Sequence, residues 1–311
     1  MKKLRMTTLV LGALLSTSLA AEPLTLLETG NVLRFIDTSA PSATIGTVPI
    51  TGLQVGEAIT AIDYRPATGA LYGVGVVTGG QSRLYIINTT TGAATLVGGG
   101  PFDSFVGLTT TAGLGMDFNP VVDRIRLVNN LGTNMRVNPD TAAVTIDTST
   151  DFAAGDPNQS NSNDPNSIAY SNNFAGALST TLYGVVSGNG PIVVRIGSPG
   201  GSPISPNTGQ MFTVGSTLTA GYSTLHQGLD ISPSGVAYAV MDNNDTLYTI
   251  NLGTGAATVV GTLPSPAQGP MDISAPGAQA TAGESIPALD PRMLAVLAIL
   301  LAVTGAVLMR R

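Results

Sequence analysis

The sequence predicts an all-β protein, folded as a β-propeller of five four-stranded blades. Three observations support this prediction. The composition is poor in charged residues, at 10% of the 311 residues, and rich in glycine, with 38 copies, which is typical of short strands joined by many turns. One stretch of sequence recurs far along the chain within a similar arrangement of apolar runs. The two ends of the repeat region carry complementary parts of one further unit.

The recurring stretch defines the repeated unit. The segment NTTTGAATLVG begins at Asn88 and NLGTGAATVVG begins at Asn251, and each follows a similar run, LYII or LYTI. Around each copy lie four short runs of roughly alternating polarity, separated by Gly, Pro, Asn or Thr-Gly turns, which predicts a four-stranded meander. Repetition of this unit predicts propeller blades. The recurring stretch is then the hairpin between the third and fourth strands of two blades.

Four complete units and one split unit account for most of the chain. The complete units cover residues 58–100, 113–147, 167–215 and 227–263. The segment 23–49 resembles strands two to four of a unit without its first strand, whereas QGPMDIS at 268–274 resembles the first strand QGLDIS at 227–232. Together they predict a closing blade shared between the N- and C-terminal segments, which pairs edges that would otherwise be exposed. A β-solenoid would need a shorter repeat, and a β-sandwich would not explain the split unit.

The N-terminal segment, residues 1–20, is predicted to be a secretory signal peptide. It has a basic start, an apolar run and then small residues. The small residues form a cleavage site, so we expect cleavage after Ala20, or after Ala21 as the second choice. An uncleaved anchor is the alternative, although the apolar run is short for crossing a bilayer. The propeller domain is predicted to follow at residues 22–276.

The C-terminal segment is predicted to be a membrane anchor. After Arg292 an apolar run without charge extends as far as Arg310 and Arg311, and its length is just sufficient to span a bilayer. We therefore expect a transmembrane helix over residues 292–311, with the terminal arginines on the cytoplasmic side and the body outside. Residues 277–291 before it form a flexible linker of mostly small residues that also contains a sorting motif.

This tail resembles the IPTL-CTERM class of bacterial protein-sorting tails, which combine a short Ile-Pro-x-Leu motif, one apolar helix and terminal arginines. The matching residues are Ile286, Pro287, Leu289, Arg310 and Arg311. Ala288 replaces the usual Thr, and the Trp that often follows is absent. The resemblance implies a membrane sorting protease as a partner, and a plain C-terminal anchor is the alternative. Both imply export across the inner membrane, with an anchor that is at least transient, and then the periplasm, the outer membrane or the cell surface.

Charge and cysteine content exclude several classes of function. The chain has no cysteine, which excludes disulfides, thiol nucleophiles and zinc–thiolate sites. The basic residues at the two ends leave seven arginines, no lysine and all nineteen acidic residues between them. An acidic body without lysine does not suit nucleic acid, because phosphates are neutralised by clustered cations. It also lacks the amine that Schiff-base chemistry needs.

Aspartates recur at one position of the predicted first strands. Asp63, Asp117, Asp230 and Asp272 lie between apolar residues, whereas the matching position of the 167–215 unit is Ala169. Because first strands usually line the central channel of a propeller, these aspartates are candidate ligands for a cation such as Ca²⁺, which prefers oxygen. The alternative is structural: each carboxylate accepts hydrogen bonds from backbone N–H groups of its own turn or of the next blade. We expect no other cofactor.

Three arginines are the candidate ligand-binding residues. Arg124 and Arg126 are two positions apart and share a face if they lie on a strand, and Arg136 follows in the next run. They suit a carboxylate or a sulfate, and the alternative is pairing with Asp123 or a neighbouring acid. No catalytic residue is predicted, because His226 is the only histidine and the chain has no Gly-x-Ser-x-Gly motif.

Several long strings resemble the bacterial family called domain of unknown function 4394, over roughly Leu24 to Ser274. They include AIDYRPATGALYGV, DFNPVVDRIRLV, NMRVNP and GLDISPSGVAYAV. The resemblance implies an exported, propeller-like domain and supplies no catalytic residues. We therefore expect a propeller at the cell surface or in the envelope, without enzymatic activity, that binds an envelope polymer or protein. A carboxylate- or Ca²⁺-dependent glycan lyase or hydrolase is one alternative, and a structural extracellular matrix component is another.

Overall fold

The computed structural model describes residues 20–277, apart from 78–80, 103–112, 162–163, 188–190, 217–226, 242–244 and 265–269. This part is almost entirely β-structure, and its only helices are two single turns of 3₁₀ helix, η1 (Pro199–Gly201) and η2 (Pro206–Thr208). Within these described residues no helix has the length and apolar character needed to cross a membrane.

The predicted signal peptide up to residue 19 and the tail from residue 278 lie outside the described residues. The same is true of the sorting motif, with Ile286, Pro287 and Leu289, and of the terminal Arg310 and Arg311. The assignments made for these segments stay predictions.

The strands form five antiparallel sheets, as the sequence predicts, and each sheet is one blade. The first blade contains β4 (Glu57–Tyr64), β5 (Leu71–Val77), β6 (Gln81–Ile87) and β7 (Ala94–Leu96). The second contains β8 (Leu114–Asn119), β9 (Arg124–Asn129), β10 (Asn134–Val137) and β11 (Val144–Ile146). The third contains β13 (Pro165–Tyr170), β14 (Leu182–Val186), β15 (Ile192–Ile196) and β16 (Gln210–Ser216). The fourth contains β17 (Gln227–Ile231), β18 (Ala237–Met241), β19 (Thr246–Ile250) and β20 (Ala257–Thr262).

The closing blade combines the two ends of the described chain, which confirms the split unit. It contains β21 (Pro270–Ser274), β1 (Pro23–Glu28), β2 (Val32–Asp37) and β3 (Thr44–Pro49), in that order. Strand β21 pairs antiparallel with β1, so that Leu26 lies opposite Ile273. The pairing covers the backbone edge of β1, which would otherwise face the centre unpaired.

The third blade has one strand more than predicted. The short strand β12 (Asp151–Phe152) pairs in parallel with the outer edge of β16. It has only two residues, which is too short to produce the alternating pattern by which the other strands are recognisable in the sequence.

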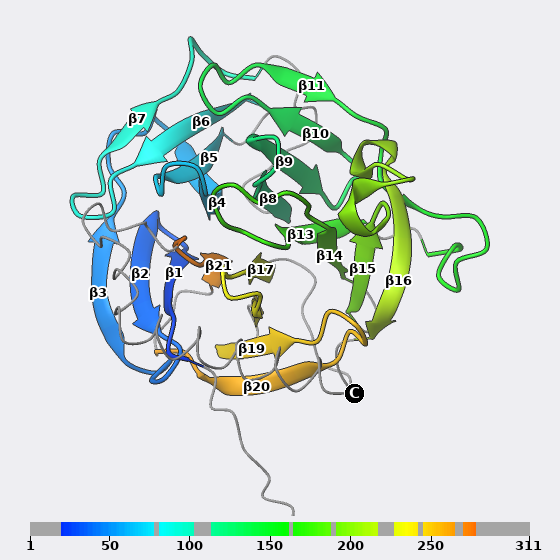
Figure 1. Cartoon of the computed structure of the whole chain (residues 1–311). Helices are drawn as coiled ribbons and strands as arrows, with labels where there is room; N and C mark the ends of the chain where they lie inside the picture. Colours follow the sequence, from blue (N-terminus) through cyan, green and yellow to red (C-terminus); the bar gives the residue numbers. More distant parts are fainter. Residues whose placement is uncertain are drawn as a thin grey trace, which may run out of the picture. The chain divides into compact units, whose positions relative to one another are not determined.

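The five blades surround a centre lined by their first strands (Figure 1). Strands β4, β8, β13, β17 and β21 are neighbours in this order, and β21 lies next to β4 again. The inner strands are buried on both faces, as in β8, whereas the outer strand β20 is largely exposed. The reason is that adjacent blades contact one another chiefly through their inner strands.

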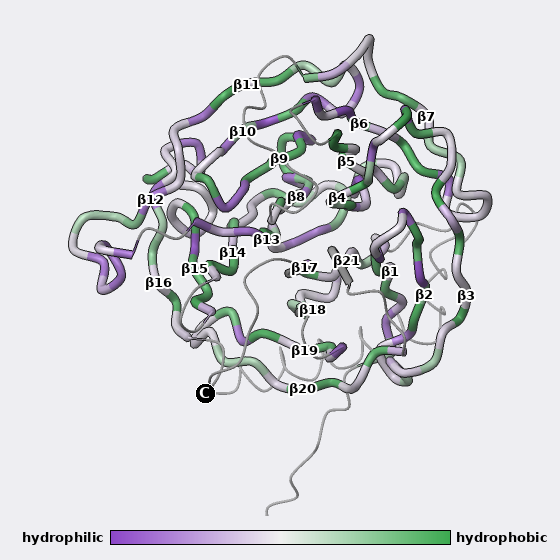
Figure 2. The backbone as a smooth tube through the Cα atoms, turned by 180° about the vertical axis from the view of Figure 1, so that it is seen from behind, coloured by the Kyte–Doolittle hydropathy of each residue, from purple (hydrophilic) through white to green (hydrophobic). Residues whose placement is uncertain are grey.

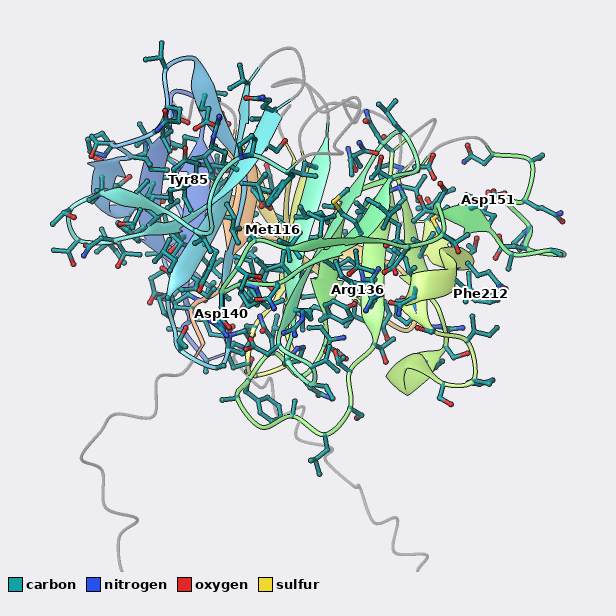
Figure 3. The ribbon with its side chains drawn as sticks, turned by 90° about the horizontal axis from the view of Figure 1, so that it is seen from above. Tyr85, Met116, Arg136, Asp140, Asp151 and Phe212 are labelled. Carbon is teal, nitrogen blue, oxygen red and sulfur yellow. The ribbon has the colours of Figure 1, made fainter. Side chains whose placement is uncertain are left out.

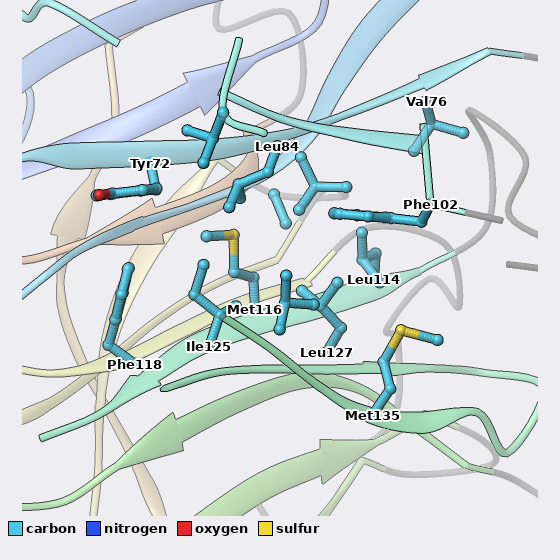
Figure 4. Close-up of a cluster of buried hydrophobic side chains, with 14 residues drawn as sticks. Tyr72, Val76, Leu84, Phe102, Leu114, Met116, Phe118, Ile125, Leu127 and Met135 are labelled. Carbon is cyan, nitrogen blue, oxygen red and sulfur yellow. The ribbon is translucent and has the colours of Figure 1, made fainter. Parts of the chain in front are cut away.

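The hydrophobic core consists of five clusters, one between each pair of adjacent blades. Hydrophobic segments accordingly occur in the strands of every blade (Figure 2). Between the first and second blades, Leu84 packs in one cluster with Met116 and Leu127 (Figure 4). The rings of Tyr72 and Phe118 meet edge to face across the same boundary, with centroids 5.1 Å apart.

The recurring stretch lies where the sequence predicts it, in the hairpin between the third and fourth strands of the first and fourth blades. Gly92 and Gly255 adopt left-handed conformations there, with φ of 74° and 76°. A Cβ atom at Gly92 would lie 1.9 Å from the carbonyl oxygen of Pro49 in the closing blade. The turn therefore needs glycine both for its backbone conformation and for the contact with the neighbouring blade.

Candidate functional site

Two arrangements of polar residues stand out, and both are built from predicted residues. The first is a ring of hydrogen bonds around the centre, made by aspartates of the inner strands. In β4, Ile62 and Tyr64 pack toward the closing blade, whereas Ala61 packs toward the second blade. Asp63 shares the face of Ala61 because side chains alternate along a strand, and it therefore points at the next blade.

Each aspartate of the ring joins its own blade to the next one. Asp63 Oδ1 accepts the N–H of Tyr64 at 2.8 Å, and its Oδ2 accepts the N–H of Phe118 in the second blade at 2.7 Å. Asp117 accepts the N–H of Tyr170 in the third blade at 3.1 Å. These bonds stabilise the ring because they pair buried carboxylates with backbone donors of the adjacent strand.

The other two aspartates complete the circuit. Asp230 in β17 accepts the N–H of Ala275, after β21, at 2.6 Å. Asp272 in β21 accepts the N–H of Ile62 in the first blade at 2.9 Å. This pattern agrees with the structural alternative, in which each carboxylate accepts hydrogen bonds from backbone N–H groups of its own turn or of the next blade. That the aspartates also hold a cation stays a prediction.

The third blade makes its connection with a different residue. Its inner strand has Ala169 at the aspartate position, and Asn173 in the following turn donates its Nδ2 to Asp230 Oδ1 in the fourth blade at 3.4 Å. Asn173 is 2% exposed, and its Oδ1 has no hydrogen-bond partner among the described residues. Sequence reasoning missed Asn173, because it lies outside the repeated position.

Three of the four aspartates come together at the centre. Asp63, Asp117 and Asp230 each offer an oxygen within 4.8 Å of those of the other two, whereas Asp272 lies outside this group. The hydroxyl of Ser274 lies 2.8 Å from Asp63 Oδ1 and 3.2 Å from Asp230 Oδ2. All four aspartates are buried, with exposed fractions between 1% and 4%.

Burial makes the charged form of these carboxyl groups unfavourable. Loss of hydration raises the pKa of all four aspartates, and it raises that of Asp230 to about 6. Repulsion from the neighbouring carboxylates raises the pKa of Asp63 and Asp117 further, against the hydrogen bonds that lower it. The centre therefore retains protons at pH values where isolated aspartates are ionised, unless a cation replaces them.

The second arrangement is a pocket of about 420 Å³ between the second and third blades, which we call the arginine pocket. It contains all three predicted ligand-binding arginines: Arg124 and Arg126 from β9, and Arg136 from β10, opposite Arg126 in the sheet register. Arg136, labelled in Figure 3, shares this pocket with residues of the third blade such as Tyr170. The remaining lining residues are Asn119, Val121, Val122, Tyr170, Leu178, Ser179, Thr180, Gly200, Gly201, Ser205, Pro206 and Asn207.

Arg126 is the buried hub of this pocket, at 2% exposed. Its Nε donates to the hydroxyl of Tyr170 at 2.8 Å, and its Nη2 donates to Asn207 Oδ1 at 2.6 Å. Its Nη1 donates to Asn134 Oδ1 and, at 3.1 Å, to Asp147 Oδ2. Arg126 therefore has a partner for each guanidinium nitrogen and serves to fix the wall between the two blades.

The other two arginines differ in their partners. Arg136 forms a bidentate interaction with the carboxylate of Asp147, through two hydrogen bonds of 2.8 Å each. Arg124 donates to the backbone carbonyl of Asp123 at 2.7 Å and forms no ion pair within the described part of the chain. The predicted alternative is pairing with Asp123 or a neighbouring acid. Arg126 and Arg136 do pair with such an acid, Asp147, whereas the carboxylate of Asp123 pairs with Arg65.

The pocket also has apolar residues among its lining. Leu178 is 96% exposed, Val122 is 56% exposed and Val121 is 42% exposed. Sequence reasoning missed these residues, because they lie in turns between strands rather than on an alternating strand. It also missed Asp147 and Asn207, and no local signal links Asn207 to an arginine 81 positions earlier. His226 lies outside the described residues.

The described residues thus define a five-bladed β-propeller with a buried carboxylate centre and a pocket lined by arginines. A family model described as Domain of unknown function (DUF4394) matches residues 32–273, and the chain belongs to this family. A search of curated proteins finds no match.

Solved structures of similar fold are distant. TolB from Acinetobacter baumannii is 13% identical with a TM-score of 0.41, over 78% of this chain and 53% of TolB, so the chain spans about half the length of that protein. A protein of unknown function from Bacteroides thetaiotaomicron is 16% identical with a TM-score of 0.47, over 82% of this chain and 64% of the other. A protein of unknown function from Bacteroides caccae is 11% identical with a TM-score of 0.39, over 79% and 74%. At these values the likenesses do not bear on the function of the chain.

Proposed function

We propose that this chain is an exported, non-enzymatic binding module and that its ligand occupies the arginine pocket. The observation that carries the proposal is Arg124, a guanidinium that lines the pocket with no ion-pair partner among the described residues. A pocket in which Arg124 forms no ion pair with any described residue, and in which Arg126 holds the wall, suits an anionic ligand. A carboxylate is favoured because the planar guanidinium can bind it with two hydrogen bonds.

The apolar residues that line the pocket restrict the class of ligand further. Val121, Val122 and Leu178 place exposed aliphatic groups in the same pocket as Arg124. A ligand that carries an apolar group next to its carboxylate would satisfy both features, whereas a bare polysaccharide would leave the aliphatic groups without a matching surface. We therefore favour the C-terminal carboxylate of an envelope protein that ends in hydrophobic residues over an acidic envelope polymer.

The aspartates of the centre do not suit catalysis on a glycan. Asp63, Asp117 and Asp230 are each about 1% exposed and bonded to backbone donors. A general acid or base has to reach the bond that it acts on, directly or through one water. Their burial favours the binding role over the alternative of a glycan lyase or hydrolase.

The location that we propose rests on the sequence of the two ends. A signal peptide cleaved after Ala20 or Ala21 would export the propeller, and the apolar tail at 292–311 would anchor it at least until a sorting protease acts on the motif around Pro287. The propeller would then face the periplasm or reach the outer membrane or the cell surface. Mass spectrometry of the purified protein tests this directly, because we expect an N-terminus at Ala21 or Glu22.

A thermal-unfolding screen of the full chain in detergent tests the binding role. The probes are a short peptide that ends in leucine with a free carboxylate, the same peptide with a C-terminal amide, and galacturonate as a sugar acid. We expect only the free carboxylate peptide to raise the melting temperature, because a ligand stabilises the folded state that binds it. A shift with galacturonate alone would show that the ligand is an acidic polymer. No shift with any probe, together with self-association of the chain, would contradict the proposal and favour a matrix component.

A further inference from the structure

We propose that the centre of the propeller binds one divalent cation of the Ca²⁺ type, with Asp63, Asp117, Asp230 and the side-chain carbonyl of Asn173 as ligands. The three aspartate oxygens lie within 4.8 Å of one another. Ca²⁺ binds oxygen at about 2.3–2.6 Å, so two ligands on opposite sides of one ion are about 5 Å apart. The three oxygens are therefore close enough to share a single ion.

Asn173 is the neutral side chain that we assign to the site beside the aspartates. Its side chain reaches Asp230, yet its Oδ1 is buried and has no hydrogen-bond partner among the described residues. An unpartnered buried carbonyl is costly. The separation of 3.4 Å between the Asn173 amide and Asp230 Oδ1 is long for a hydrogen bond, and it is a normal separation for two atoms that bind the same ion. In the structure Nδ2, not the unpartnered Oδ1, is the amide atom next to Asp230, so Asn173 becomes a ligand only when its amide turns by 180° and places Oδ1 at that position.

The negative charge of the three buried aspartates also favours a bound cation. Within the described part of the chain, no arginine forms an ion pair with Asp63, Asp117 or Asp230. Buried carboxylates this close together need protons or a cation to offset their repulsion. Carboxylate and amide oxygens are hard ligands, which suit Ca²⁺ rather than zinc or copper.

Such an ion would hold the blades together. Asp63 comes from the first blade, Asp117 from the second, Asn173 from the third and Asp230 from the fourth. The closing blade also contacts the proposed ion site, because the hydroxyl of Ser274 contacts both Asp63 and Asp230. We therefore assign the ion a structural role, separate from the ligand in the arginine pocket.

The test compares Ca²⁺ binding by the wild-type full chain and two aspartate variants. The protein is treated with EDTA, its metal content is measured by mass spectrometry, and Ca²⁺ is then added while binding heat and melting temperature are recorded. We expect uptake of one Ca²⁺ per chain and a rise in melting temperature of at least about 3 °C. Asp117→Asn should lose this rise. Asp272→Asn, which changes the same ring position outside the group of three, should keep it.

Several results would overturn the proposal. One is a wild-type chain that binds no Ca²⁺ after EDTA treatment and melts at the same temperature with and without it. Another is loss of the Ca²⁺ effect in Asp272→Asn together with Asp117→Asn, which would locate the binding elsewhere. If Asp117→Asn fails to fold, Asn173→Ala replaces it, because this variant removes the neutral ligand and should weaken Ca²⁺ binding by about 10-fold or more. Unchanged Ca²⁺ binding in Asn173→Ala would remove Asn173 from the site and contradict the proposal as stated.

Discussion

Thr25 in β1 lies directly opposite Ser274 in β21, so the two ends of the described chain meet side by side in the closing blade. Both hydroxyls also contact the first blade. Thr25 Oγ1 is 2.9 Å from the hydroxyl of Tyr64, and Ser274 Oγ is 2.8 Å from Asp63 Oδ1. The joint between the two ends is therefore also a contact between the closing blade and the first blade, and the ring depends on it.

Removal of the last strand should open the ring. A chain that ends before Pro270 lacks β21, which leaves the edge of β1 unpaired and removes Ile273 from the core between the fourth and closing blades. We expect this chain to lose its cooperative thermal transition, measured by circular dichroism. A chain that ends after Gly277 keeps β21 and serves as the control, which should melt within a few degrees of the full chain. Equal melting of the two truncated chains would show that β21 is dispensable.

The cores between blades should determine the stability of the domain. Leu127 is fully buried in the cluster between the first and second blades, so Leu127→Ala should lower the free energy of unfolding by about 2–5 kcal/mol. Val259 is 61% exposed on the outer strand β20, and Val259→Ala should change the free energy by no more than about 0.5 kcal/mol. Urea unfolding of both variants measures the difference. Similar losses in the two would contradict this account of the core.

Arg126 should matter for stability far more than Arg136. Arg126→Met removes a buried guanidinium and leaves Asp147, Asn134 and Asn207 with fewer partners. We expect a loss of about 3–5 kcal/mol in the free energy of unfolding. Arg136 is 33% exposed, and among the described residues its side chain bonds to Asp147 alone, so Arg136→Gln should cost about 1 kcal/mol or less. A smaller loss in Arg126→Met than in Arg136→Gln would contradict the role of Arg126 as the hub.

The aspartate centre should make stability depend on pH. The folded-state pKa of each of the four aspartates is raised, so the folded state binds more protons than the unfolded chain. Their contribution is then fully present below the unfolded pKa of about 4, and it is lost as the pH rises through the folded values, beginning near the pKa of about 6 for Asp230. In EDTA we expect a lower melting temperature at pH 8 than at pH 5.

Two comparisons check the origin of this dependence. Asp230→Asn removes one of the titrating groups and should flatten the decrease in melting temperature between pH 5 and pH 8. Ca²⁺, if it replaces protons at the centre, should reduce the decrease in the wild-type chain. A melting temperature in EDTA that rises steadily from pH 5 to pH 8 would contradict the raised pKa values.

The sequence predicts the blades well because the information is local and repeated. Each blade has alternating strands with turns at regular places, and glycine recurs in the left-handed turns at Gly92 and Gly255. The split closing blade was predictable because QGPMDIS repeats a first strand while the N-terminal segment lacks one. The two-residue strand β12 was not predictable, because its partner β16 lies far along the chain and two residues carry no pattern.

The candidate sites were only partly predictable, for a related reason. Asp63, Asp117, Asp230 and Asp272 occupy a repeated position, so the repeat itself placed them near one another at the centre. Asn173 makes the connection that Ala169 cannot, but it does so from a turn whose approach to Asp230 depends on packing between two blades. The apolar lining of the arginine pocket was missed because turn residues of different blades meet only in the folded chain.

The most direct test of the account is calorimetric titration of the full chain with the leucine-terminated carboxylate peptide and its amide. We expect the wild-type chain to bind the carboxylate form, and Arg124→Gln to bind it about 10- to 100-fold more weakly, because a charge-assisted hydrogen bond is worth about 1.5–3 kcal/mol. Arg195→Gln is the matched control, since Arg195 lies on β15, donates to the carbonyl of Gly197 and does not line the pocket. Equal binding of carboxylate and amide, or equal affinity of the wild type and Arg124→Gln, would contradict the proposed binding function.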